Sequence, residues 1–303
     1  RNLQGSVPSY TTAPVSEWLG SHVYAALGIP VHETVLGIRD GRIVCACRDF
    51  TFPDSRLVNF HDLKNSLSDD EPGFTEDAST GSGVVLADVR SAIHRIPVLR
   101  SIDGVSDRFW DMFVVDAFIR NIDRNNTNWG VLRNPRGEFS LAPVYDNGNS
   151  FNNKRTDSGI ERRLANPDLI RQDALDVRSC YVTDRGKPIA PLKYLASGQD
   201  EECTKALDRF MERYDPRSFH DLLGSIPSMS HGLTVVPDGF HEYHRRVCDY
   251  RYEHAFMEAW RDLHPTVGVP SSPEASVPEP LPDPDPSVLP SSSVPTCFDG
   301  PGM

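Results

Sequence analysis

The chain has 303 residues, 38% of them hydrophobic, and carries a formal net charge of −12 at pH 7. This length allows a sizeable hydrophobic core and one or two domains. The acidic balance argues against non-specific binding to nucleic acid or to an anionic membrane, and no apolar run approaches the about 20 residues of a membrane-spanning helix. The N-terminal stretch "RNLQGSVPSY" has no apolar signal region, so a cytoplasmic protein is expected.

The first predicted elements are a helix and a β-hairpin. Residues 14–29, "PVSEWLGSHVYAALGI", have helical apolar spacing, and Gly28 is placed to end the helix. Residues 32–50, "HETVLGIRDGRIVCACRDF", read as two strands joined by an Asp-Gly turn. The polar, acidic and Gly-rich stretch 69–83 is predicted to be a loop.

The middle of the chain is dominated by one apolar segment. "SDRFWDMFVVDAFIRN" (106–121) predicts a helix that is buried along most of its length, and 85–96 predicts a shorter helix before it. A second hairpin with a Pro/Gly turn is expected at 128–143. Residues 150–200 are mixed, with a hairpin expected around "TDRGKP".

The last part divides into helices and a tail. Helices are predicted at 200–214, 216–226 and 238–263. His241 and His244 lie three residues apart on the last of these helices, but no third metal ligand is apparent, so a solvated helix face is expected. Eleven of the 25 prolines fall within 265–303, which predicts a disordered tail.

The six cysteines form no CxxC pair. Cys45 and Cys47 are two residues apart on a predicted strand, so their side chains share one face. A zinc site is possible there, but no second pair completes it. Reduced thiols in a cytoplasmic protein are the expected state.

The stretch "NIDRNNTNWG" (121–130) follows the buried helix and places an acid among four asparagines. In an antiparallel hairpin the start of the first strand lies beside the end of the second, so 128–143 should gather Asp123, Asn128 and Asp146 at one edge. Two carboxylates and a carboxamide are ligands for a hard cation such as Mg²⁺. They also suit phosphoryl transfer, with one Asp accepting the proton of the attacking hydroxyl.

The order Asp-x₄-Asn, hairpin, Asp is that of protein-kinase catalytic sites. Here Asn121-Ile122-Asp123 replaces His-Arg-Asp, so this is not an ordinary eukaryotic-type kinase. Arg124 follows the acid and is a candidate for phosphate contact, although an arginine after a helix is commonly a surface residue.

"NIDRNNTNWGVL" and "SLAPVYDNGNSF" resemble the motifs of the HipA-like serine/threonine kinases, and the likeness extends over about residues 14–260. The resemblance implies that Asp123 is the catalytic base and that Asn128 and Asp146 hold Mg²⁺. It implies that Glu17 steadies the lysine that binds ATP. It also implies that Arg48, Asp49 and Phe50 lie at the adenine hinge.

The fold implied is α+β and protein-kinase-like, with two lobes. Residues 1–50 would be the remnant of a small β lobe, 51–264 a mainly helical C-lobe with the catalytic β-hairpin, and 265–303 the tail. The implied partners are ATP, Mg²⁺ and a protein substrate. A helix-turn-helix antitoxin is a further possible partner, because members of this family often act as toxins.

One departure concerns the upper part of the nucleotide site. The family's ATP-binding lysine and phosphate-covering loop should precede the Glu17 helix, but the first lysine of this chain is Lys64. The missing lysine and loop, together with the absent initiating Met, predict that the chain is truncated upstream and is inactive as it stands. The alternative is that the protein is a pseudokinase. A small-molecule or lipid kinase is a further alternative, because phosphoinositide-type kinases share an Asp-Arg-x₃-Asn loop.

Overall fold

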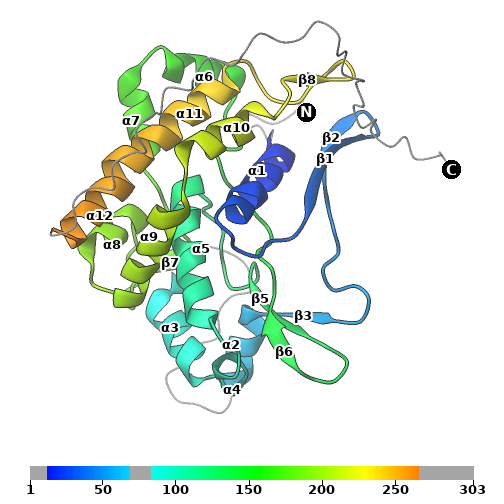
Figure 1. Ribbon diagram of the computed structural model, residues 1–303, viewed down its shortest axis with the longest axis vertical. Helices are drawn as coiled ribbons and strands as arrows, with labels where there is room; N and C mark the ends of the chain where they lie inside the picture. Colours follow the sequence, from blue (N-terminus) through cyan, green and yellow to red (C-terminus); the bar gives the residue numbers. More distant parts are fainter. Residues whose placement is uncertain (1–11, 69–82, 266–303) are drawn as a thin grey trace, which may run out of the picture. The chain divides into compact units, whose positions relative to one another are not determined.

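The computed structural model describes residues 12–68 and 83–265 (Figure 1). The acidic loop expected at 69–83 and the tail expected at 265–303 fall outside this part, apart from their boundary residues. Within it, no helix is both long enough and apolar enough to cross a membrane.

The predicted N-terminal helix and hairpin are confirmed. Helix α1 spans Ala13–Ala26, and the chain leaves it through Gly28, whose φ of 70° is one that glycine adopts at little cost. Strands β1 (Thr34–Arg39) and β2 (Arg42–Cys47) pair antiparallel, with Thr34 opposite Cys47. Asp40 and Gly41 both have positive φ at the turn, as a tight hairpin requires.

The predicted buried helix is α5, Val105–Ile119, and it forms the centre of the core. Its Phe118 ring packs against Phe210 of α9 (Glu201–Arg213) at a centroid distance of 5.3 Å. It also packs edge-on against Phe256 at 5.7 Å. The helix ends at Arg120, whose left-handed φ of 57° turns the chain sharply into residues 121–128.

The predicted second hairpin is part of a three-stranded antiparallel sheet. Its strands are β5 (Gly130–Arg133) and β6 (Phe139–Leu141), and β3 (Arg56–Asn59) adds to the outer side of β5. A side chain at Gly130 would bring its Cβ to 2.3 Å from the carbonyl oxygen of Val58, so this crossing requires glycine. The sequence did not predict β3, because a strand of four residues is too short to show a clear alternation of apolar and polar side chains.

Short helices cover the rest of the core (Figure 1). They are α2 (Phe60–Ser68), α3 (Leu86–Arg95), α4 (Pro97–Arg100), α6 (Asp157–Leu164), α7 (Pro167–Leu175), α8 (Pro191–Ser197) and α10 (Pro216–Gly224). The helix predicted at 238–263 is α11 (Phe240–Arg251) and α12 (Met257–Leu263), joined by a π-helical turn at Tyr252–Phe256. Two-stranded pairs are formed by β4 (Val84–Val85) with β7 (Tyr181–Val182), and by β8 (Met229–Ser230) with β9 (Leu233–Thr234).

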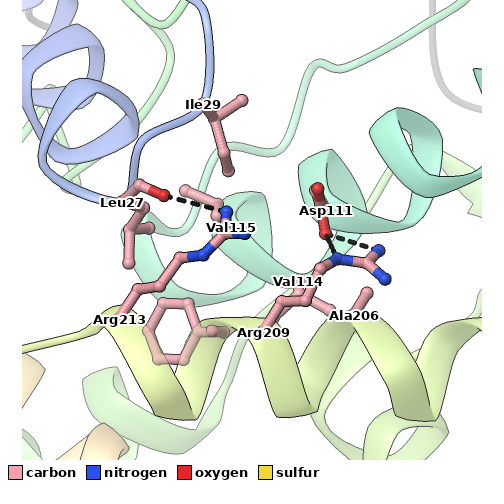
Figure 2. A pocket seen from close by; sticks show the side chains of 9 residues that line it. Leu27, Ile29, Asp111, Val114, Val115, Ala206, Arg209 and Arg213 are labelled. Atoms are coloured by element: carbon pink, nitrogen blue, oxygen red, sulfur yellow. Dashed lines mark hydrogen bonds and ion pairs between the residues drawn. The ribbon is translucent and has the colours of Figure 1, made fainter. Parts of the chain in front are cut away.

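The C-terminal end of α1 is anchored to α9 beside a small pocket (Figure 2). Arg213 donates from Nη1 to the carbonyl oxygen of Leu27 at 3.2 Å, which satisfies one carbonyl that the helix leaves open. One turn earlier, Arg209 binds Asp111 of α5 at 2.7 Å. These two polar contacts connect α9 to α1 and to α5. They are directional, so they fix the relative positions of the helices more closely than apolar packing alone would.

The expectation that His241 and His244 share a solvated face is wrong for His244. Its side chain is buried and lies edge-on to Phe240 and Phe151, at centroid distances of 4.3 and 5.8 Å. Burial, and then the charge of Arg251, lowers the pKa of His244 to about 3. The histidine is therefore a neutral member of the core.

The low pKa of His244 makes a prediction about stability. The unfolded chain binds a proton at this residue below about pH 6.5, whereas the folded chain does so only near pH 3. The free energy of unfolding should therefore fall as the pH is lowered through this window, by on the order of 3 kcal/mol between pH 7 and pH 4. Urea unfolding at both pH values measures this fall in the free energy of unfolding. The fall should be smaller in His244→Leu than in the wild type, while the exposed control His254→Leu should match the wild type. Equal losses in all three proteins would contradict the assignment.

Candidate active site

A buried ion pair organises the loops that carry the predicted catalytic residues. Arg124 follows Asp123 directly, and its Nε donates to Asp116 Oδ2 of α5 at 2.9 Å. Both side chains are almost inaccessible, at 2% and 7% exposed. Arg124 is thus neither a surface residue nor a candidate phosphate contact, and both expectations for it are wrong.

Arg124 uses its remaining donors to hold two separate loops. Nη1 donates to the carbonyl oxygen of Asn128 at 2.9 Å and to that of Tyr145. Nη2 donates to Asn147 Oδ1 at 2.6 Å. A guanidinium has five N–H donors in a fixed fork, which makes such multiple bonding possible from one side chain. The loop 121–128 and the loop 145–148 are therefore fixed to one group.

The carboxylate of Asp123 is held within its own loop. Asn125 Nδ2 donates to Asp123 Oδ1 at 3.0 Å. Asn125 Oδ1 in turn accepts from the backbone N–H and hydroxyl of Thr127, at 2.9 and 2.6 Å. Asn128 Nδ2 donates to the carbonyl oxygen of Asp123 at 2.7 Å. Asn128 Oδ1 accepts from the Thr127 hydroxyl at 3.2 Å, and its second lone pair can still serve a ligand.

Asp146 lies on the facing loop in a left-handed conformation, with φ of 57°. Aspartate tolerates this region better than most residues, although it still carries a backbone cost of about 1–3 kcal/mol. The neighbours on either side provide the compensation, because the Tyr145 carbonyl and the Asn147 side chain both bind Arg124. Asn121 joins the loops again: its Nδ2 donates to the Asp146 carbonyl at 3.5 Å, and its Oδ1 accepts from the Asp123 N–H at 3.2 Å.

The electrostatics of Asp146 show that several charged groups surround it. Desolvation raises the pKa of its carboxyl group, Arg124 opposes this, and the carboxylates of Glu17 and Asp123 raise it further. Carboxylates that repel each other in this way are stabilised by a cation between them. The structure thus brings Asp123, Asn128 and Asp146 to one edge of the hairpin, as their spacing predicts, with Glu17 nearby.

Glu17 lies on α1 where this helix approaches the loop at 145–148. A side chain at Gly148 would put its Cβ 3.2 Å from Glu17 Oε2, and one at Gly20 would put its Cβ 2.8 Å from the Asn147 Cβ. Glu17 Oε1 accepts from His32 Nε2 at 2.8 Å. Burial raises the pKa of Glu17, but the bonds from His32 and from the Asn147 backbone lower it below its usual value.

The lysine that Glu17 was expected to steady is not found next to it among residues 12–68 and 83–265. The first lysine of the chain, Lys64, lies on α2 with its Nζ 3.9 Å from Asp88 Oδ2. The partner of Glu17 in the described chain is His32.

The expected hinge segment follows β2, and its three side chains have different environments. Arg48 binds the Glu33 carboxylate at 2.9 Å, and Asp49 accepts from the Thr51 N–H at 2.8 Å. Only Phe50 lies against the site, with its ring 5.6 Å from that of Tyr145. The side chains of Arg48 and Asp49 are thus engaged in local contacts at the surface.

Sequence reasoning missed the residues that support the site. Asp116 and His32 are polar residues in or beside apolar stretches, and a buried acid within "FVVDAFI" is itself a signal that a partner exists. The identity of that partner, Arg124, depends on the left-handed turn at Arg120 that folds the chain back against α5.

No protein-family model matches this chain. Among curated proteins, the serine/threonine-protein kinase CtkA of Helicobacter pylori is 34% identical over 224 residues, which are 73% of this chain and 66% of CtkA. The chain therefore spans about two thirds of the length of this relative.

Among solved structures, the proinflammatory kinase CtkA of Helicobacter pylori matches with a TM-score of 0.76 and 29% identity, covering 86% of this chain and 90% of that one. HipA of Shewanella oneidensis, solved with HipB and operator DNA, matches with a TM-score of 0.48 and 14% identity over 84% of this chain and 59% of HipA, a likeness too low to support an argument. The mixed helix-and-sheet architecture is thus that of the CtkA kinase fold. Sequence identity and fold together show that the chain belongs to the HipA-like serine/threonine kinase family.

Proposed function

We propose that this protein transfers the γ-phosphate of ATP to a serine or threonine hydroxyl of a protein substrate. The observation that carries the proposal is the cluster of Asp123, Asn128 and Asp146, whose two loops are bound to the same buried guanidinium. Phosphoryl transfer needs little covalent chemistry from a protein and depends on positioning and electrostatic stabilisation. A rigid cluster of oxygen ligands, with the Glu17 carboxylate nearby, meets that need.

Asp123 is proposed as the catalytic base. Its carboxylate is partly exposed, so a substrate hydroxyl can reach it, and the Asn125 amide at 3.0 Å orients it. It would orient the hydroxyl and accept its proton as the oxygen attacks phosphorus. The family position of Asn125 holds histidine, and in this chain the carboxamide supplies the hydrogen bond to the acid.

Asn128 and Asp146 are proposed to hold Mg²⁺. One carboxamide oxygen and one carboxylate are ligands of the kind that Mg²⁺ takes in phosphate-transfer sites, where it keeps several waters. The raised pKa of Asp146 is consistent with this fit: desolvation is its largest cause, and the carboxylates of Glu17 and Asp123 add to it, and a cation would offset all three. When bound, the ion neutralises charge on the phosphates. The residues themselves contribute fixed ligand positions, because Arg124 and Asn121 hold both loops.

The nucleotide site is proposed to extend from this cluster toward α1 and the end of β2. Glu17 is the candidate for contact with the lysine that binds ATP, and residues 48–50 are the candidate adenine hinge. Phe50 is the best supported of these three, because its ring lies beside Tyr145. In this arrangement α1, β1 and β2 belong to a small lobe and the remaining helices to a large one.

The substrate and the partner are proposed from similarity to known proteins. CtkA is named a serine/threonine-protein kinase, which favours a protein hydroxyl over a metabolite or a lipid. A helix-turn-helix antitoxin and a cytoplasmic location remain proposals from the family resemblance. A second candidate function is a pseudokinase that binds nucleotide without transfer, which is favoured by the His32 contact to Glu17.

The first prediction concerns Asp123. We expect Asp123→Ala to reduce phosphate transfer at least about 100-fold, because general-base catalysis contributes roughly 10² to 10⁴ in rate. Labelled ATP and the protein expressed from its complete reading frame provide the measurement. The variant should still bind ATP and unfold near the wild-type temperature, because within the described residues the Asp123 carboxylate bonds only to its own loop.

The matched control is Asp184→Ala, an exposed acid on the turn after β7. This variant should transfer phosphate as the wild type does. Near wild-type transfer by Asp123→Ala would remove this residue as the base. Binding of ATP without transfer by the wild type itself would support the pseudokinase.

The second prediction concerns Asp146. Asp146→Asn keeps the shape of the side chain but removes the charge that attracts the cation. We expect at least a tenfold increase in the Mg²⁺ concentration needed for half-maximal ATP binding, measured by calorimetry at fixed nucleotide. ATP binding without Mg²⁺ should be unchanged or slightly stronger, since one repulsive charge is lost. An unaltered Mg²⁺ dependence would place the metal elsewhere.

The third prediction separates positioning from stability. Arg124→Lys cannot reproduce the bonds to all of Asp116, Asn128, Tyr145 and Asn147, and disturbing a buried ion pair costs about 3–5 kcal/mol. We therefore expect a lower unfolding temperature, together with a raised Mg²⁺ requirement and a lower kcat for the folded fraction. Arg251→Lys is the matched control, because Arg251 is equally buried but binds carbonyls of Phe118, Asp173 and Ala174. Arg251→Lys should lose stability while its Mg²⁺ requirement stays at the wild-type value. An equal shift of the Mg²⁺ requirement in both variants would mean that Arg124 has only a structural role.

A further inference from the structure

Glu17, His32 and Cys47 form a cluster for which the proposed phosphotransfer chemistry does not account. They offer one carboxylate oxygen, one imidazole nitrogen and one sulfur, and these atoms all lie within 4.8 Å of one another. Within residues 12–68 and 83–265, this is the group of three or more such side chains close enough to hold a metal ion. The zinc site that the Cys45 and Cys47 pair suggests thus acquires the additional ligands that the sequence did not reveal.

The fold brings these residues together from three places in the chain. Glu17 lies in α1, His32 precedes β1, and Cys47 ends β2. The hairpin register pairs Thr34 with Cys47, so the end of β2 returns beside the segment that carries His32. The His32 backbone is fixed in turn, because its N–H donates to the Val144 carbonyl at 2.9 Å.

The donor set selects the class of metal. Thiolate and imidazole are ligands of Zn²⁺ and related transition metals, whereas Mg²⁺ and Ca²⁺ prefer oxygen alone. Three protein ligands with a fourth position taken by water or by a further side chain form a common zinc arrangement. Cys45 is the candidate fourth ligand, since it shares the strand face of Cys47 two residues away.

The surroundings of the cluster suit a cation. The His32 and Glu17 side chains are only 6% and 13% exposed, whereas Cys47 is exposed. Two of the three ligands are therefore buried, and a metal ion can reach the cluster from solvent on the side of Cys47. Desolvation and the negative charge of Glu17 raise the pKa of the Cys47 thiol, and Asp146 adds to this. Negative charge of this kind attracts a metal cation.

A supporting layer of polar groups is also present. Ser21 Oγ lies 3.1 Å from His32 Nε2 and accepts from Asn147 Nδ2 at 3.0 Å. The Asn147 backbone also donates a hydrogen bond to Glu17. Such outer contacts orient the ligands of metal sites and tune their basicity.

We propose that Glu17, His32 and Cys47 form a binding site for Zn²⁺ or a metal of similar chemistry, with Cys45 or water completing the coordination. Binding replaces the hydrogen bond between His32 and Glu17 with bonds from each to the ion. The ion then ties α1 to the end of β2, next to the loop that carries Asp146. This inference stands on the geometry of the cluster and is independent of the proposed phosphotransfer.

The experiment is titration of the purified, reduced protein with Co²⁺, which reports zinc-type sites through its absorption spectrum. A thiolate ligand gives a sulfur-to-cobalt charge-transfer band in the near ultraviolet. We expect this band to reach its maximum at one equivalent of Co²⁺ per chain and to disappear when Zn²⁺ is added. Calorimetry with Zn²⁺ alone should give the same stoichiometry.

Cys47→Ser is the decisive variant, because it changes one exposed atom and leaves the His32–Glu17 contact in place. It should retain the wild-type circular dichroism and unfolding temperature but lose the charge-transfer intensity of its own sulfur and at least tenfold in Zn²⁺ affinity. Where Cys45 is the fourth ligand, a weaker band remains and disappears when Cys45→Ser is added. Glu17→Gln should weaken binding as well, without removing the band. Cys203→Ser and His22→Gln are the matched controls: each removes a thiol or an imidazole outside the cluster, and each should bind as the wild type does.

Two results would overturn the proposal. A wild-type protein that binds no Co²⁺, or that binds it without a thiolate band, has no such site. A band that keeps its full intensity in Cys47→Ser, or that disappears in a cysteine variant other than Cys47→Ser and Cys45→Ser, assigns the metal to a different part of the chain. Because the readout is spectroscopic, loss of kinase activity in any variant does not affect the conclusion.

Discussion

The structure around the site depends on one buried ion pair, between Arg124 and Asp116. Each member is costly to bury alone, and the removal of one would leave an uncompensated charge in the core. Tyr24 of α1 and Asn121 complete the polar environment of Asp116, donating to it at 2.8 and 3.2 Å. The pair therefore links α1, α5 and both active-site loops through one connected set of hydrogen bonds.

The rigidity of α5 is what makes this arrangement effective. The helix is buried along most of its length, and its Phe118 ring packs tilted against Phe210 of α9 and edge-on against Phe256 of the π-helical turn. Its last turn presents Asp116, and the left-handed Arg120 then turns the chain so that Arg124 returns onto that same turn. A well-packed apolar helix thus provides a fixed base for the polar loop.

The two polar networks of the site share Asn147. On one side its side-chain oxygen Oδ1 accepts from Arg124, and on the other its side-chain nitrogen Nδ2 donates to Ser21, which contacts His32. Two hydrogen bonds therefore connect the Glu17, His32 and Cys47 cluster to the residue next to Asp146.

The sequence by itself determined the elements and the chemical character of the site. Helical spacing identified α1, α5 and α9, turn residues identified both hairpins, and the order of Asp123, Asn128 and Asp146 predicts phosphotransfer chemistry, because these signals are local along the chain. Tertiary structure alone decided that Arg124 and His244 are buried, that β3 joins the second hairpin, and that His32 approaches Glu17 and Cys47. These features depend on contacts between residues distant in sequence, and no local periodicity records which buried polar group finds which partner.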